Sequence, residues 1–190
     1  DQEALPLARR LNDYSGVTRG LVNLGGALYE SGQHAESKPL FDEALSRARE
    51  SGDRFAESIV LYNLGKIGEQ TGDFPEANTR YAESLDLFHT AGNLPGVAAC
   101  LERIGTVAAR LGDDLLAVRL FGAADALRAT TGAAREPVDH GEYERDLTAL
   151  KGRVSPETFA AAWADGAAMS VADAVALALG CHASSADATD

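Results

Sequence analysis

The fold is decided by residues 53–92, which read DRFAESIVLYNLGKIGEQTGDFPEANTRYAESLDLFHTAG. Two helical patterns are separated by Gly72-Asp73, and the stretch closes on Gly92. Glycine adopts the left-handed conformation that ends a helix, and an aspartate side chain accepts a backbone N–H bond at the start of the next helix. The stretch therefore predicts two helices joined by a tight turn.

The same pattern recurs 40 residues away on both sides without a gap. The repeated positions are Leu24-Gly25, Leu64-Gly65 and Ile104-Gly105; Phe41, Tyr81 and Phe121; and Gly52, Gly92 and Gly132. Self-similarity at a fixed period indicates a helical repeat array. We predict units over 13–52, 53–92 and 93–132, preceded by a partial helix over 1–12, so that the array covers residues 1–132.

Each unit carries a glycine inside its first helix, at Gly25, Gly65 and Gly105. A glycine within a helix destabilises it by about 1 kcal/mol relative to alanine. Three glycines at one register predict a shared cause, namely a second helix that crosses there and leaves no room for a side chain.

The repeat register stops after Gly132, and the remaining residues predict a cap for the open end of the array. We expect capping helices within 133–180, namely one over 138–152, one that begins at Ser155-Pro156 and a short one over 171–179. Phe159 and Trp163 share a face of the middle helix and are expected to plug the array. Residues 181–190 are predicted to be a disordered tail.

Composition excludes several classes of function. The net charge is −12, so we expect no direct contact with nucleic acid. Two cysteines make no disulfide framework, no apolar run spans a membrane, and we expect a cytoplasmic protein. No phosphate loop, nucleophile elbow or metal-binding spacing occurs, which predicts a chain that is not an enzyme and has no cofactor and no metal site. Cys100 is expected to be a core residue.

The repeat resembles the tetratricopeptide repeat family, through the Leu-Gly pair, the aromatic of the second helix and small residues at Ser37, Ala77 and Ala117. The period is 40 residues, longer than the family's roughly 34, and neither the Trp nor the Pro of the family pattern is present. The resemblance implies an all-α, tetratricopeptide-like superhelix of antiparallel helix pairs with C-terminal capping helices. It also implies a binding function, with a protein or peptide partner, or a small-molecule inducer, in the concave groove.

The family's groove positions can be carried over by register. They are Arg19, Val22, Asn23, Gly26 and Tyr29 in the first unit, Ile59, Tyr62, Asn63, Lys66 and Glu69 in the second, and Glu102, Arg103, Thr106 and Arg110 in the third. Asn23 and Asn63 have two interpretations. A carboxamide can hold an extended peptide backbone, or it can bond locally within the array.

A second resemblance covers about 100–179. The segments Arg119–Arg128, Tyr143–Leu147, Phe159–Gly166 and Ser170–Ala178 resemble the C-terminal repeat region of bacterial STAND-class signalling ATPases, which carry LuxR-type or SARP-type DNA-binding domains or other output domains. This resemblance implies a fragment of such a protein, acting as a sensor or scaffold arm in signal transduction and transcription regulation. The alternative is an oligomerisation module, such as a homodimer, with an unused groove.

Overall fold

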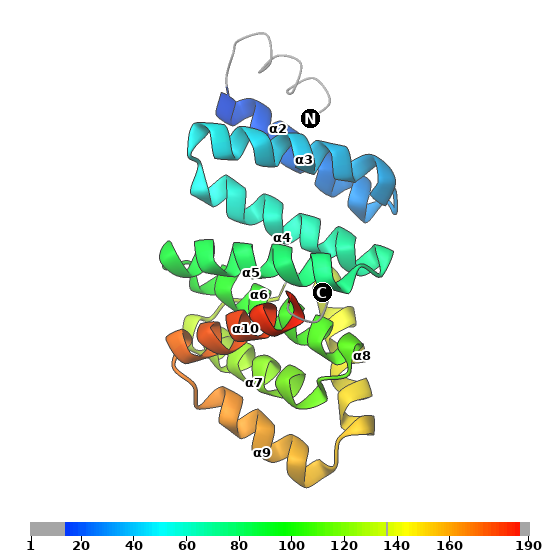
Figure 1. Cartoon of the computed structure of the whole chain (residues 1–190), viewed down its shortest axis with the longest axis vertical. Helices are drawn as coiled ribbons and strands as arrows, with labels where there is room; N and C mark the ends of the chain where they lie inside the picture. Colours follow the sequence, from blue (N-terminus) through cyan, green and yellow to red (C-terminus); the bar gives the residue numbers. More distant parts are fainter. Residues whose placement is uncertain (1–13, 136, 187–190) are drawn as a thin grey trace. The chain divides into compact units, whose positions relative to one another are not determined.

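The computed structural model describes residues 14–135 and 137–186, and every regular element in these ranges is an α-helix. The all-α prediction is confirmed (Figure 1). The predicted partial helix over 1–12 lies outside the described residues. The helices are α2 (Tyr14–Glu30), α3 (His34–Ser51), α4 (Arg54–Thr71), α5 (Phe74–Thr90), α6 (Leu94–Leu111), α7 (Asp114–Thr131), α8 (Pro137–Arg153), α9 (Pro156–Ala167) and α10 (Val171–Ala186).

The turns between helices have the chemistry that the sequence predicts. Gly52 follows α3 with a φ of 69°, a left-handed conformation that a residue with a side chain rarely adopts. Asp53 then caps α4, because its side chain accepts a hydrogen bond from the backbone N–H of Ala56 at 2.9 Å. Asn93 and Asp113 cap α6 and α7 in the same way.

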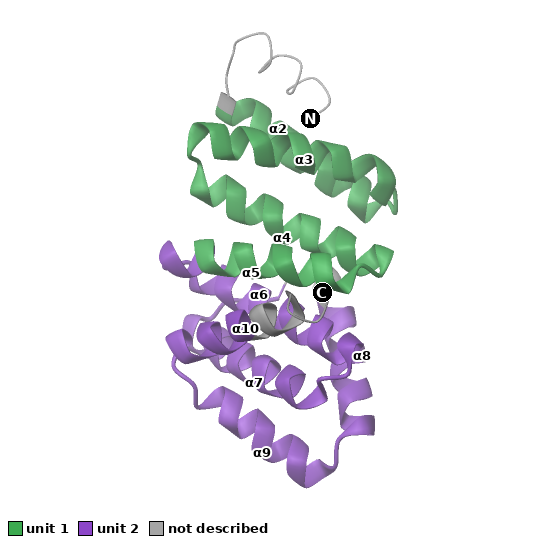
Figure 2. Cartoon of the chain, in the orientation of Figure 1, with its two compact units in different colours: residues 1–87 green, residues 88–190 purple. Residues whose placement is uncertain are grey.

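The chain divides into two compact units, residues 1–87 and residues 88–190 (Figure 2). The first unit holds α2, α3, α4 and most of α5, and the second holds the end of α5 and α6–α10. The boundary therefore falls inside α5.

In the first unit, each helix pair is held by an aromatic ring that lies on a glycine. A Cβ atom at Gly65 would lie 2.5 Å from the ring of Tyr81, and one at Gly25 would lie 3.0 Å from the ring of Phe41. Both rings are fully buried. The expected close crossing is therefore present in these two pairs, and the side chain that fills it is the repeated aromatic residue.

The third pair differs from this expectation. A Cβ atom at Gly105 would meet its nearest neighbours, the carbonyl oxygen of Ala117 and the Cβ of Leu120, at 3.4 Å, which is ordinary van der Waals contact. Its distance to the Phe121 ring would be 3.8 Å. The prediction that Gly105 leaves no room for a side chain is therefore wrong, because Phe121 does not press on the glycine as Tyr81 does.

The C-terminal cap is held by glycines and not by the predicted aromatic plugs. Helix α9 packs on α7 so closely that a side chain at Gly122 would overlap the Trp163 carbonyl, and one at Gly166 would overlap the Arg119 carbonyl. Ala162 and Gly166 form the buried face of α9. Phe159 and Trp163 are only half-buried, and their rings stack on each other with centroids 5.7 Å apart.

The other cap helices lie close to their predicted positions. Ser155 caps α9 as predicted, accepting a hydrogen bond from the backbone N–H of Thr158. Helix α10 runs to Ala186, past the predicted end at Leu179, because its alanine-rich sequence contains only Gly180 as a weak helix breaker. Residues 181–186, which belong to the predicted disordered tail, are thus part of α10, and 187–190 lie outside the described residues.

We expect Gly65→Ala to destabilise the protein by about 1–3 kcal/mol, because the added methyl group overlaps the buried Tyr81 ring. Gly105→Ala is the matched control at the same repeat position. It should be neutral or stabilising by up to about 1 kcal/mol, since there is room for the methyl group. Chemical denaturation of the two variants measures the difference, and equal stabilities would contradict the ring-on-glycine contact.

We also expect Gly166→Ala to loosen the cap, because the methyl group would displace the Arg119 backbone. Limited proteolysis should cut after α8 in this variant, and binding of a hydrophobic dye should increase as the face of α7 becomes exposed. Gly141→Ala places the same methyl group on α8, where no atom lies within 4 Å, and should have neither effect. A Gly166→Ala variant as resistant as the wild type would disprove the close α7–α9 packing.

Candidate binding groove

The first unit contains a cavity of about 350 Å³ between α2 and α4. Arg19, Val22 and Asn23 of the predicted groove line it from α2, and Ile59 lines it from α4. No residue of α3 contributes, so the cavity opens on the face formed by the first helices of the two pairs. The remaining lining residues are Ser15, Thr18, Asp53, Phe55 and Ala56.

The walls of this cavity combine apolar, aromatic and charged groups. Val22, Ala56 and Ile59 supply half-buried apolar surface. Phe55 is 56% exposed, the highest value among the large hydrophobic residues that the structure describes. Arg19 is exposed on the same cavity. Ligand sites typically have this composition, with mostly apolar walls and a few polar groups that orient the ligand.

Sequence reasoning missed Phe55, although a signal for it was present. The repeat register places Ser15 and Pro95 at the same position, so a large aromatic occurs there only in the second unit. It directly follows Arg54, the first residue of α4, near the Asp53 cap, where its side chain has little to pack against. An exposed apolar residue that breaks the repeat could therefore have been identified from the sequence alone.

Tyr29 and Lys66, also predicted for the groove, form a second cluster with His34. The rings of Tyr29 and His34 lie with centroids 4.7 Å apart, and the Lys66 ammonium lies 5.1 Å from the centre of the Tyr29 ring. The Nδ1 atom of His34 is buried without a hydrogen-bond partner among the described residues. None of these three residues lines the cavity between α2 and α4.

The other predicted residues of α4 contact their own unit. Asn63 donates its Nδ2 hydrogen to the carbonyl oxygen of Ile59 at 2.9 Å, which is the local interpretation of this side chain. Tyr62 packs on Tyr81 with ring centroids 5.6 Å apart. Glu69 accepts a hydrogen bond from the Tyr81 hydroxyl. These groups help to position α5 on α4.

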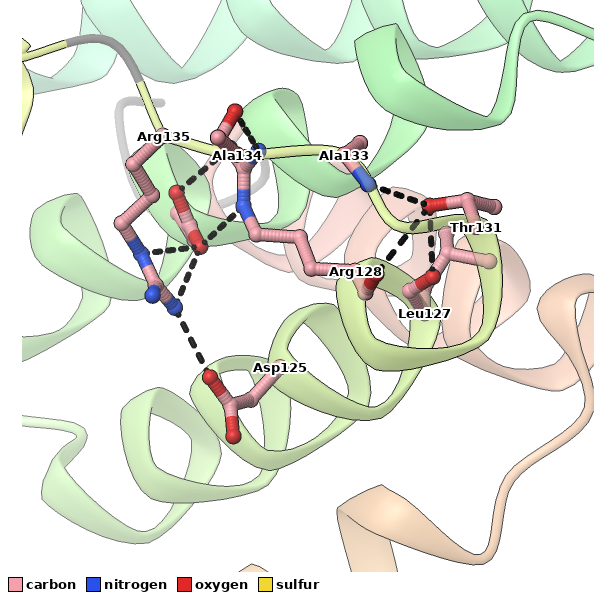
Figure 3. A network of polar contacts seen from close by, with 8 residues as sticks. Asp125, Leu127, Arg128, Thr131, Ala133, Ala134 and Arg135 are labelled. Carbon is pink, nitrogen blue, oxygen red and sulfur yellow. Dashed lines mark hydrogen bonds and ion pairs between the residues drawn. The ribbon is translucent and has the colours of Figure 1, made fainter.

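In the second unit, Glu102 is the centre of a buried ion network. Arg128 donates two hydrogen bonds to its carboxylate, at 2.8 and 2.9 Å, and Arg135 donates a third at 2.9 Å. Arg135 also bonds Asp125 at 3.0 Å (Figure 3). Burial opposes the charge of Arg135, but Glu102 and Asp125 outweigh it and raise the pKa of this guanidinium.

The same network contacts α8 through Tyr143. The Arg135 guanidinium lies 3.6 Å from the centre of the Tyr143 ring, and this ring meets Phe121 edge-on with centroids 5.4 Å apart. Burial raises the pKa of Tyr143 to about 12, although Arg135 acts in the opposite direction. The phenol therefore stays neutral over the whole physiological pH range.

Helix α8 also covers the other predicted groove residues of α6. Arg103 pairs with Glu142 at 2.7 Å, while Thr106 and Arg110 bond the two carboxylate oxygens of Asp146, each at 2.9 Å. Arg103 and Thr106 are buried. The structure therefore places this face of α6 against the chain's own α8, whereas Arg19, Val22 and Asn23 of α2 line an open cavity.

Several observations concern the predicted absences. Cys100 is fully buried, as expected for a core residue. Among the described residues, no cluster of three or more His, Cys, Asp or Glu side chains is placed to hold a metal ion. No single helix in residues 14–135 and 137–186 is long and apolar enough to cross a membrane; α9 and the first part of α10 reach that length and composition only as a pair bent by 118°.

Comparison with known proteins places these features in context. Three mycobacterial proteins, each named as an HTH-type transcriptional regulator, are 37% identical to this chain over 83 residues. One is from Mycobacterium bovis, and the other two are from two strains of Mycobacterium tuberculosis. The match covers 44% of this chain and 9% of each regulator. No solved structure gives a significant match. Residues 16–90, which run from α2 to the end of α5, match the family model of the tetratricopeptide repeat, and the fold of the chain is all-α and tetratricopeptide-like.

Proposed function

We propose that this chain is a non-catalytic binding module and that its binding site is the cavity between α2 and α4. The observation that carries the proposal is the pairing of an exposed aromatic, Phe55, with an exposed cation, Arg19, on one cavity of about 350 Å³. The tetratricopeptide-repeat match over residues 16–90 supports a protein-interaction module. The partner is a protein or peptide that brings an apolar side chain and a carboxylate to this cavity.

Arg19 stands apart from the other arginines. Every other arginine in the described residues forms an ion pair with an Asp or Glu, whereas Arg19 forms none with any residue of those ranges. Acidic residues outnumber Lys and Arg by 29 to 17 in the sequence, so carboxylates are abundant on this chain. The Arg19 guanidinium is exposed and pairs with no carboxylate of the described residues. It is therefore available to bind a carboxylate of the partner through two parallel hydrogen bonds.

Phe55 supplies the apolar half of the site. Aromatic and arginine side chains near the centre of an interface contribute most of the binding energy in many protein complexes. Phe55 and Arg19 meet this description together, since they lie on opposite helices of the same cavity. Asn23 adds an exposed carboxamide, which can both donate and accept hydrogen bonds to a peptide backbone.

We further propose that the module belongs to a larger bacterial regulator, in which it acts as a cytoplasmic sensor or scaffold arm. Two observations support this proposal. The matched mycobacterial proteins are named as transcriptional regulators and are much longer than this chain. The segments after Arg119 also resemble the repeat region of STAND-class ATPases. In this arrangement the acidic repeat module binds the partner, and a separate domain contacts DNA.

A second candidate function is self-association through the turn between α6 and α7. Leu111 and Leu115 are 53% and 41% exposed, and the repeat register places Ser31 or Thr71, and Ala35 or Pro75, at these positions. Replacement of small or polar residues by two exposed leucines favours a homodimer contact. Light scattering of the wild type and of Leu111→Ser with Leu115→Ser tests it, since only a mass that falls to the monomer value supports the dimer.

We expect the double variant Arg19→Gln with Phe55→Ala to lose its partner. An aromatic anchor and a charge-assisted hydrogen bond each contribute on the order of 2 kcal/mol, so affinity should fall by at least about 100-fold. Proteins captured from a bacterial lysate by the immobilised wild type and by the variant would be compared by quantitative mass spectrometry. The affinity of any protein lost from the variant would then be measured by calorimetry.

Lys38→Ala is the control for this experiment, because Lys38 is an exposed cation on α3 that does not line the cavity. It should retain every captured protein. Both variants should melt near the wild-type temperature, since all three side chains are exposed. A partner that binds the double variant as tightly as the wild type would show that the cavity is not the binding site.

The two asparagines should separate binding from stability. Asn23→Ala removes an exposed group at the cavity and should weaken partner binding by about fivefold, which corresponds to about 1 kcal/mol for one hydrogen bond, with little change in melting temperature. Asn63→Ala breaks the bond to the Ile59 carbonyl and should chiefly lower stability. Binding that depends on Asn63 and not on Asn23 would instead move the site toward the C-terminal half of α4.

A further inference from the structure

The second unit contains an apolar cleft of about 280 Å³, separate from the proposed binding site. It lies between α6, α7 and the turn that joins α9 to α10. Leu101, Ala123 and Ala174 form its buried floor. Thr130 and Ser170 lie at its exposed mouth.

The cleft results from the way that the cap packs. Glycines at the contact between α7 and α9 let the backbones of these two helices approach closely. The chain then turns by 118°, so that α10 packs back on α6 and α7. The surfaces that meet across the cleft carry small side chains, among them Ala123, Ala126 and Ala174. Small residues on both sides leave unfilled volume in a region where protein interiors are otherwise close-packed.

The residues that line the cleft disfavour a charged ligand. No charged side chain of the described residues lines the cleft. Its two hydroxyl groups already donate within their own segments, Thr130 to the Ala126 carbonyl at 2.9 Å and Ser170 to the Asp173 carboxylate at 2.6 Å. Both hydroxyl oxygens can therefore only accept a further hydrogen bond. The Asp173 carboxylate beside the mouth also disfavours an anion.

We propose that this cleft binds a small, uncharged, apolar molecule that carries at most one hydroxyl group. A dry apolar cavity of about 150 Å³ accepts benzene, and the present cleft is nearly twice that size. It matches a medium-chain alcohol or a two-ring aromatic. The apolar part lies against Leu101 and Ala174, and a hydroxyl at the mouth donates to the oxygen of Thr130 or Ser170.

Such a ligand would touch α7 and α10 at the same time. Helix α10 is held in the second unit mainly through small buried residues, Ala174, Val175 and Ala178. A ligand in the cleft adds apolar contact to this packing and should increase the hydrogen-exchange protection of α10. Occupancy of the cleft would thus be reported by the C-terminal helix, independently of the proposed α2–α4 site.

The test uses the full chain and 1-octanol as the probe, with octanoate and octylammonium as charged analogues of equal length. The amide signals of Ala126 and Ala174 should shift saturably with 1-octanol, and hydrogen exchange over residues 171–180 should slow. Octanoate and octylammonium should bind at least tenfold more weakly. No saturable shift up to the solubility limit, or equal binding of the three probes, would overturn the proposal.

Three variants locate the site. Ala126→Leu fills the cleft from α7, and Ala167→Leu narrows its exposed mouth. Each should abolish the 1-octanol shifts. Ala161→Leu adds the same bulk on the exposed side of α9, outside the cleft, and should leave binding intact. If Ala126→Leu does not fold, Ala167→Leu decides, and a folded Ala167→Leu variant that still binds 1-octanol with wild-type affinity would place the ligand elsewhere.

Discussion

In the first unit, the contact between an aromatic ring and a bare glycine backbone sets the distance between paired helices. Tyr81 and Phe41 are fully buried, and their rings occupy the space that a side chain at Gly65 or Gly25 would need. Phe41 holds α3 on α2, the helix that carries Arg19 and Val22, and Tyr81 holds α5 on α4, the helix that carries Ile59. The two helices that form the cavity are thus each held within their pair by a contact that lies outside the cavity.

The charged residues predicted for the groove have different environments in the two units. In the second unit, Glu102 and Arg103 are buried and satisfied by partners from α7, α8 and the segment between them. Breaking such a buried pair would leave an uncompensated charge, which is far less favourable than losing an exposed one. In the first unit, Arg19 is exposed and pairs with no carboxylate of the described residues. Replacing Arg19 would therefore leave none of these carboxylates without a partner.

The sequence predicted the elements that depend on local chemistry. Gly52 and Asp53 end and start helices through their own backbone and side chain, so their roles follow from residue type alone. The exposure of Phe55, the neighbours of Gly105 and the face of α6 covered by α8 depend on segments distant in sequence. Phe159 and Trp163 are an example of what the spacing of residues alone does not predict. Their spacing correctly predicts a shared face, but only the positions of Gly122 and Gly166 show which face of α9 is buried.

The close approach of α9 to α7 has a consequence for which helix can end this array. The last repeat of a solenoid needs a cap over its exposed apolar face. Here the middle of α7 presents Gly122 to a short helix of 12 residues whose own Gly166 meets the α7 backbone. A helix with a side chain at the position of Gly166 would overlap the Arg119 carbonyl at this distance. The face of α7 therefore selects a terminal helix that carries a glycine at the contact.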